Sequence, residues 1–344
     1  MVGACRPTRF ALMPVARSSY RAPAWLPGRH LQTIYPALAL RPRPPSYRRE
    51  RWEWPDGDFV DVDHVDGPRS APLVVLFHGL EGNSGSHYAA ALMGAVAARG
   101  WRGAVPHFRG CSGEPNRLPR AYHSGDADEI ARMVARLAPA ASLPLLLCGV
   151  SLGGNAMLKW LGREGAAATG LVRAAVAISA PLDLNAAGAA LRHGLSRLYA
   201  AEFLRTLKPK TLAKLDRFPD LFDASTMRAA RTFDVFDDIF TAPVHGYRDV
   251  TDYWTQASSK GGLAAIAVPT LVLNARNDPF LPARFLPGPD QVAAAVVLEQ
   301  PESGGHVGFA AGRFPGHLNW LPQRVLRFFD ENATEITSGF PNPA

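Results

Sequence analysis

Residues 145–155 read LLLCGVSLGGN, an apolar run that leads directly into a serine flanked by glycines. A continuous apolar run of this kind is typical of a strand that is buried on both faces of a parallel sheet. Gly149, Ser151 and Gly153 match the pattern G-x-S-x-G, in which the glycines leave space for a sharp turn between a strand and a helix. We therefore predict a strand at 145–150, a tight turn that carries Ser151, and a helix from residue 154 to about 163.

The residues on either side of this stretch alternate between strand and helix patterns. Residues 51–54 and 59–65 flank the turn sequence PDGD and predict an antiparallel hairpin. Further strands are expected at 72–77, 102–107, 174–178, 270–274 and 295–298, with helices at 88–98, 126–137 and 321–332. This order predicts an α/β fold with a mostly parallel central sheet covered by helices.

Between residues 185 and 265 the strand pattern disappears and aromatic residues become frequent. Within it, residues 198–207 predict a helix that ends before Pro209. We interpret 185–265 as a helical lid inserted into a core made of residues 51–184 and 266–334. Residues 1–50 form a basic N-terminal arm and residues 335–344 a C-terminal tail in this division.

The net charge of +7 lies almost entirely in the arm. Residues 1–50 hold nine arginines and one acid, Glu50, so the remaining residues are nearly neutral. A basic nucleic-acid groove on the body is therefore not expected. The start of the arm is interpreted as a poorly ordered basic segment, with a targeting peptide as the alternative. Its arginines could make a weak contact with anionic membrane surfaces.

The apolar segments and the cysteines indicate in which part of the cell the protein is expected. No apolar segment approaches the roughly 18 to 20 residues that a membrane-spanning helix needs. Cys5, Cys111 and Cys148 are scattered and odd in number, without the spacing of a redox or zinc motif. A soluble, cytoplasmic protein is expected, and its oligomeric state is left open.

Two residues further along the chain, Asp278 and His306, complete a candidate catalytic set with Ser151. Asp278 follows the strand at 270–274, and His306 follows the last strand in the sequence GGHVG. A serine hydroxyl is a weak nucleophile unless a histidine takes its proton and a carboxylate orients that histidine. Because each residue follows its own strand, all three are expected to meet at the carboxyl edge of the sheet in the order Ser, Asp, His.

Acyl transfer also needs donors for the oxyanion that forms in the transition state. The backbone N–H of Leu152 is one candidate, because it follows Ser151 directly. The N–H of Leu80, in the glycine-containing loop 78–83, is the other. His78 in the same loop is interpreted as a structural histidine rather than a second base.

Other polar residues are given structural interpretations. Asp126, Asp128 and Glu129 are expected in the first turn of a helix, where they favour its dipole. Arg109 and Cys111 follow a strand and are expected to shape the edge of the site, whereas Cys148 is expected in the core. No cluster with metal-ligand spacing and no phosphate-binding loop is found, so neither a metal nor a cofactor is expected.

The chain resembles the α/β-hydrolase superfamily, specifically the YheT-type hydrolases related to the mammalian abhydrolase-domain lipid hydrolases. The resemblance extends from about residue 25 to 329. It is carried by HLQTI at 30–34, HGLEG at 78–82, FRGCSGEPN at 108–116, YHSGD at 122–126, SLGGN at 151–155, FD at 233–234, TAP at 241–243 and GGHVGF at 304–309. It implies a serine carboxylester hydrolase in which Ser151, Asp278 and His306 form the triad and short or medium acyl esters or lipids are substrates.

Three functions remain open at this point. Hydrolysis through an acyl-enzyme is the main hypothesis, an acyltransferase with the same triad is the first alternative, and a non-catalytic ligand-binding protein is the second. Lid residues could line an acyl pocket or form the lid's own core; they are Leu195, Leu198, Tyr199, Phe203, Leu204, Tyr253 and Trp254.

Overall fold

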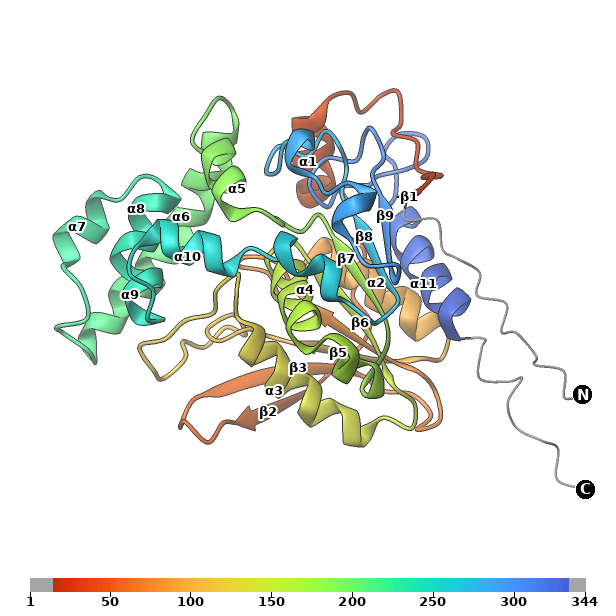
Figure 1. The fold of residues 1–344 in the computed structure, drawn as a ribbon, viewed down its shortest axis with the longest axis horizontal. Coiled ribbons are helices and arrows are strands. Elements are labelled where there is room, and N and C mark those ends of the chain that lie inside the picture. Colours follow the sequence, from red (N-terminus) through yellow and green to blue (C-terminus); the bar gives the residue numbers. More distant parts are fainter. Residues whose placement is uncertain (1–14, 334–344) are drawn as a thin grey trace, which may run out of the picture.

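The computed structural model describes residues 15–333, which form a nine-stranded sheet with helices on both faces (Figure 1). The strand order is β1-β9-β8-β7-β6-β4-β5-β3-β2. The strands are β1 Val15–Ala16, β2 Arg48–Glu53, β3 Phe59–Val65, β4 Leu73–Phe77, β5 Arg102–Pro106, β6 Leu145–Val150, β7 Val172–Ile178, β8 Thr270–Leu273 and β9 Val296–Glu299. All neighbours from β5 to β1 in this order pair in parallel, and β2 and β3 form the antiparallel edge, which confirms the predicted fold class.

Two apolar layers hold the helices on the sheet. Helices α3 (Ala127–Leu137) and α4 (Leu152–Glu164) pack on one face, where Ile130, Met133 and Leu158 are buried. Helices α2 (His87–Ala98) and α11 (Trp320–Ala333) cover the other face. Each predicted strand and helix of the core is present with ends that differ by at most about three residues; β2 begins at Arg48 and α4 at Leu152, directly after Ser151.

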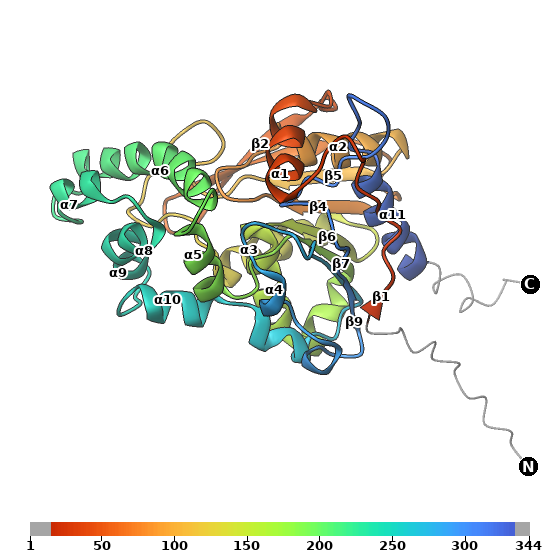
Figure 2. The ribbon, with the colours of Figure 1, turned by 90° about the horizontal axis from the view of Figure 1, so that it is seen from above.

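The residues between β7 and β8 form a group of helices that lies at the opposite end of the molecule from α11 (Figures 1 and 2). The α-helices are α5 Leu184–Leu191, α6 Ser196–Leu212, α7 Ala224–Ala229, α8 Phe233–Phe236, α9 Ala242–Val244 and α10 Val250–Ala257. Helix α6 continues past Pro209, contrary to the expectation that it ends there. Pro209 lies in the last turn and lacks the N–H that would donate to the carbonyl of residue 205, so the helix forgoes that one hydrogen bond and ends three residues later.

Residues 15–50, which the sequence analysis assigned to the basic arm, pack on the core. Strand β1 pairs with β9, and the hydroxyl of buried Tyr20 donates to the carbonyl of Ala310 at 2.8 Å. Residues 29–39 form helix α1 (Arg29–Ala39), and β2 already begins at Arg48. Few local patterns indicate this packing, because β1 is only two residues long and α1 contains Pro36 and lacks a side-chain cap.

The expectations for the start of the arm, for Cys5 and for the tail 335–344 concern residues outside the described range. Among residues 15–333, none of the helices has the length and apolar character needed to cross a membrane.

Candidate active site

Ser151 lies at the turn between β6 and α4, at backbone angles φ 51° and ψ −119°. Few L-residues adopt a positive φ, so the neighbouring residues must hold this conformation. A Cβ atom on Gly149 would lie 2.6 Å from the Cα of Gly154, so only glycine permits this close approach. The serine N–H donates to the carbonyl of Ile178 on β7 at 2.8 Å, which fixes the turn to the sheet.

The structure brings Ser151, His306 and Asp278 together. His306 Nδ1 lies 2.9 Å from Asp278 Oδ2, and its Nε2 lies 3.0 Å from Ser151 Oγ. An ionised carboxylate only accepts hydrogen bonds, so the proton is on Nδ1 and Nε2 is left to accept from the serine hydroxyl. The arrangement is therefore poised to remove the serine proton.

Asp278 and His306 are themselves held in place. The N–H of Phe280 donates to Asp278 Oδ1 at 2.7 Å, and the carboxylate is buried. The Phe280 ring stacks on the His306 ring with 4.0 Å between centroids. Stacking and hydrogen bonding together limit the imidazole to one orientation.

Helix α1 supports the loops that carry Asp278 and His306. The side-chain oxygen of buried Gln32 accepts from Asn277 Nδ2 at 2.9 Å and from the N–H of Gly304 at 3.0 Å. Thr33 Oγ1 accepts from the N–H of His306 at 2.9 Å. Gln32 thus connects both loops, a positioning role that our sequence reasoning missed. The sequence signal for this role is HLQTI at 30–34.

The two candidate oxyanion donors flank the serine. Leu152 begins α4, and Leu80 follows Gly79, where a Cβ atom would lie 3.2 Å from the Cβ of Ser151. His78 is fully buried, and its Nδ1 lies 2.8 Å from the carbonyl of Gly79. Its Nε2 accepts from the N–H of Phe108 at 3.0 Å, and burial lowers its pKa to about 3. These contacts agree with a structural histidine that holds the Leu80 loop.

A pocket of about 740 Å³ extends from Ser151 under the lid. Its wall near the serine includes Leu80 and Leu152, and its lid wall is rich in aromatic side chains, namely Phe203, Phe233, Phe236, Phe240, Tyr253 and Trp254. Among the lid residues that the sequence analysis left open between an acyl pocket and a lid core, Phe203, Tyr253 and Trp254 line the pocket. Leu204 packs inside the lid. Leu195 and Leu198 are exposed to solvent.

Asn155 ties helix α4 to the end of the lid. Its buried Nδ2 donates to the carbonyls of Ser124 and Ala257, both at 2.8 Å. Its Oδ1 accepts from the N–H of Ser259 at 3.1 Å. Asn155, the last residue of SLGGN, thus fixes the C-terminal part of the lid relative to the turn that carries Ser151.

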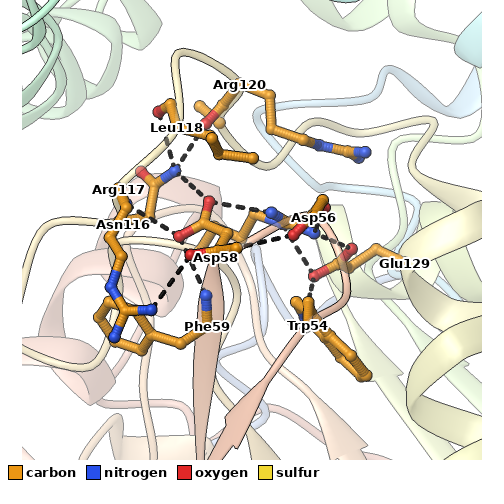
Figure 3. Close-up of polar contacts among 12 residues, drawn as sticks. Trp54, Asp56, Asp58, Phe59, Asn116, Arg117, Leu118, Arg120 and Glu129 are labelled. Atoms are coloured by element: carbon orange, nitrogen blue, oxygen red, sulfur yellow. Dashed lines mark hydrogen bonds and ion pairs between the residues drawn. The ribbon is translucent and has the colours of Figure 1, made fainter.

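Arg109 and Cys111 line the pocket at Ser151, as expected, and the buried guanidinium of Arg109 is also the centre of an ion cluster. The Arg109 guanidinium contacts Asp56 and Asp58 at 2.9 Å each and Glu129 at 3.1 Å. Figure 3 shows these three acidic residues close together. Asn116 Nδ2 adds a bond of 2.7 Å to Asp58. Although Glu129 lies in the first turn of α3 as expected, its side chain is fully buried and serves this cluster.

Within residues 15–333, no group of three or more His, Cys, Asp or Glu side chains is arranged to hold a metal ion. Cys111 and Cys148 are buried free thiols, and burial raises the pKa of Cys111 to about 12. A thiol that resists ionisation is a poor nucleophile, so Ser151 has no competitor in Cys111.

Comparisons with known proteins show to which family the chain belongs. A family model for the α/β-hydrolase fold matches residues 72–312. The chain is 40% identical to "Putative esterase YheT" of Escherichia coli over 86% of this chain and 88% of that protein. It is 29% identical to "Phospholipase ABHD3" of Mus musculus, over 94% of this chain and 80% of that protein.

Among solved structures, an esterase of Pyrococcus furiosus aligns with a TM-score of 0.55 at 15% identity, over 85% of this chain and 97% of that one. At this identity the match supports the fold alone. The sequence relatives and the family model go further: the chain belongs to the α/β-hydrolase family, and within it to the YheT-type abhydrolase-domain hydrolases.

Proposed function

We propose that the protein is a serine carboxylester hydrolase that acts on short- to medium-chain acyl esters or lipids. The observation that carries the proposal is the continuous hydrogen-bond chain from Asp278 through His306 to Ser151, which ends at the apolar pocket. Relatives named as an esterase, a phospholipase and a monoacylglycerol lipase support an ester substrate.

In the proposed reaction, His306 Nε2 takes the proton of Ser151 Oγ as the oxygen attacks the ester carbonyl. Asp278 stabilises the imidazolium that forms. The N–H groups of Leu80 and Leu152 stabilise the oxyanion of the tetrahedral intermediate. His306 then protonates the leaving alcohol, which departs and leaves an acyl-enzyme. A water, deprotonated by His306, attacks the acyl carbon and releases the acid and the free serine.

Acyl transfer is the second candidate, because an alcohol or thiol could attack the acyl-enzyme in place of water. Product analysis with competing acceptors separates the two reactions. An ester or thioester product in excess of the free acid would favour transfer.

The experiment that tests hydrolysis is turnover of p-nitrophenyl esters by the wild type and by Ser151→Ala. We expect Ser151→Ala to abolish turnover and to keep the wild-type circular dichroism spectrum and melting temperature. A control, Ser142→Ala, removes an exposed hydroxyl that donates to the carbonyl of Arg69 outside the pocket and should retain turnover. Turnover by Ser151→Ala at the wild-type rate would refute the proposal.

A further inference from the structure

A second hollow lies on the lid, apart from the pocket at Ser151. It is a groove of about 770 Å³ between α6 and residues 228–232, and we call it the lid groove. Of its lining residues, only Leu191 also lines the pocket under the lid. The lid groove is therefore a separate surface rather than the mouth of the candidate active site.

The lid groove is strongly basic. Five cationic side chains line it, Arg197, Arg205, Lys208, Arg228 and Arg231, and no carboxylate does so. Arg205 shares its charge with Glu202, an exposed pair on the same helix. Within residues 15–333, the other four cations form no ion pair with a carboxylate. A concentration of unpaired positive charge attracts anionic partners.

The two walls of the lid groove are joined by Lys208. Its ammonium group donates to the carbonyls of Arg228 and Ala230 at 2.6 and 2.9 Å. These bonds fix the 228–232 segment against α6, so the arginines on both walls are held on one surface. A preformed arrangement loses less conformational entropy on binding.

Exposed leucines accompany this charge. Leu195 and Leu198 line the lid groove and are 60% and 64% exposed. Close to these leucines, His30 Nδ1 on α1 lies 3.1 Å from the hydroxyl of Tyr199 on α6. Helices α1 and α6 are therefore neighbours, and Figure 2 shows both helices along the same edge of the molecule. Helix α1 exposes three further apolar side chains at helical spacing, namely Leu31 at 51%, Ile34 at 40% and Leu38 at 65%.

We propose that the lid groove and these leucines form a docking surface for an anionic lipid membrane. Arginine and lysine side chains attract lipid phosphates, and leucines at the same edge can enter the acyl boundary of the bilayer. A polar polyanion would use the cations but would leave the leucines exposed to water. The proposal differs from the expected contact through the arginines of the arm, because its cations lie on the lid.

The test is co-sedimentation of the full-length protein with vesicles of phosphatidylglycerol in phosphatidylcholine and of phosphatidylcholine alone. The charge variant is Arg197→Gln with Arg231→Gln. The matched control is Arg69→Gln with Arg248→Gln, two exposed arginines outside the lid groove. Both double variants change the net charge equally and share the same N-terminal residues, so a contribution from that segment cancels. The readout needs no ester turnover, so it does not depend on the proposed hydrolysis.

We expect the charge variant to lower the partition coefficient on anionic vesicles by roughly 10- to 30-fold and the control by much less. Leu195→Ser with Leu198→Ser should weaken binding to both kinds of vesicle, and high salt should weaken binding to the anionic vesicles alone. Equal binding to anionic and neutral vesicles, or equal losses in the charge variant and the control, would overturn the proposal. Loss of heparin binding in the charge variant without any vesicle binding would also overturn it.

Discussion

The positive φ of Ser151 is maintained by contacts on both sides of the turn. Such a conformation raises the free energy of the native state by about 1 to 3 kcal/mol, so it persists only where the surroundings impose it. The bond from the Ser151 N–H to Ile178 and the close approach of Gly149 to Gly154 provide that constraint. The result is a hydroxyl that points at His306 before any substrate arrives.

Gln32 offers the sharpest test at the scale of one residue. Gln32→Met keeps the side-chain volume but removes the acceptor for Asn277 and Gly304, so the loops of Asp278 and His306 can shift relative to each other. We expect kcat to fall by roughly 10- to 100-fold with little change in KM, because the reacting groups are misplaced while the pocket is intact.

The control for Gln32 is Leu31→Ala, on the exposed face of α1. It should leave ester turnover unchanged. A Gln32→Met enzyme with wild-type kcat would show that the Asp278 and His306 loops hold their positions without α1.

Several elements meet at Arg109. The cluster joins the turn before β3, the loop after β5 and helix α3 through three carboxylates (Figure 3). Removing one partner of a buried ion pair leaves an uncompensated charge, which costs about 3 to 5 kcal/mol. We therefore expect Arg109→Met to lower the free energy of unfolding by that amount in urea titrations.

Arg132→Ala is the matched comparison, because Arg132 also pairs with Asp56 but its side chain is 43% exposed. An exposed pair contributes less than about 1 kcal/mol. Equal losses in the two variants would mean that the Arg109 cluster is no more important than a surface pair.

The lid helices should determine the preference for acyl length. If the aromatic wall binds the acyl chain, kcat/KM should rise from acetyl to hexanoyl esters. Each added methylene would then stabilise the transition state by up to about 0.8 kcal/mol. Phe203→Ala, in the pocket wall, should flatten the series, whereas Val235→Ala, exposed on α8, should not. A flat or falling series in the wild type would refute an acyl-binding lid.

The stability of the whole molecule should depend on pH through buried histidines. Burial lowers the pKa of His78 and His123 to about 3 and that of His87 to about 4. Below pH 6.5 the unfolded chain binds protons at these residues that the folded chain does not bind, so their contribution is complete above pH 6.5 and is lost as pH falls. Asp237 acts in the opposite direction, because burial raises its pKa to about 6.

For these four groups the balance is two protons in favour of the unfolded chain between about pH 6 and 4, and burial lowers the pKa of His64 and His245 in the same direction. The free energy of unfolding should therefore fall by at least about 3 kcal/mol per pH unit in this range. Urea titrations at pH 7, 6 and 5 measure it. A free energy of unfolding that does not change over this range would contradict the assignment of neutral buried histidines.

Across the whole chain, the sequence predicted the core best where the apolar pattern matched the burial. Strand β6 is continuously apolar and is buried on both faces, so its position could be predicted within a residue. Helix α1 shows the opposite case. It buries Gln32, Thr33 and Pro36 and exposes leucines, so hydrophobic periodicity does not reveal which face meets the core.

Local sequence patterns indicate some residues of the candidate site and not others. Ser151, Asp278 and His306 could be proposed because each follows a predicted strand. The contact of Gln32 with Gly304 joins residues 272 positions apart, and no local pattern indicates such a pair. Arg109 and Glu129 likewise appear as separate surface charges until the fold buries them together.

The most direct test of an activated serine is labelling with a fluorophosphonate probe, followed by tryptic mass spectrometry, with Ser151→Ala as control. The probe reacts only where a serine hydroxyl is activated by a neighbouring base, so it tests Ser151 and His306 together. We expect a single adduct on Ser151 that is absent from Ser151→Ala. A folded wild-type protein that takes up no label, or an adduct on another serine, would contradict it and would favour a ligand-binding protein on the same scaffold.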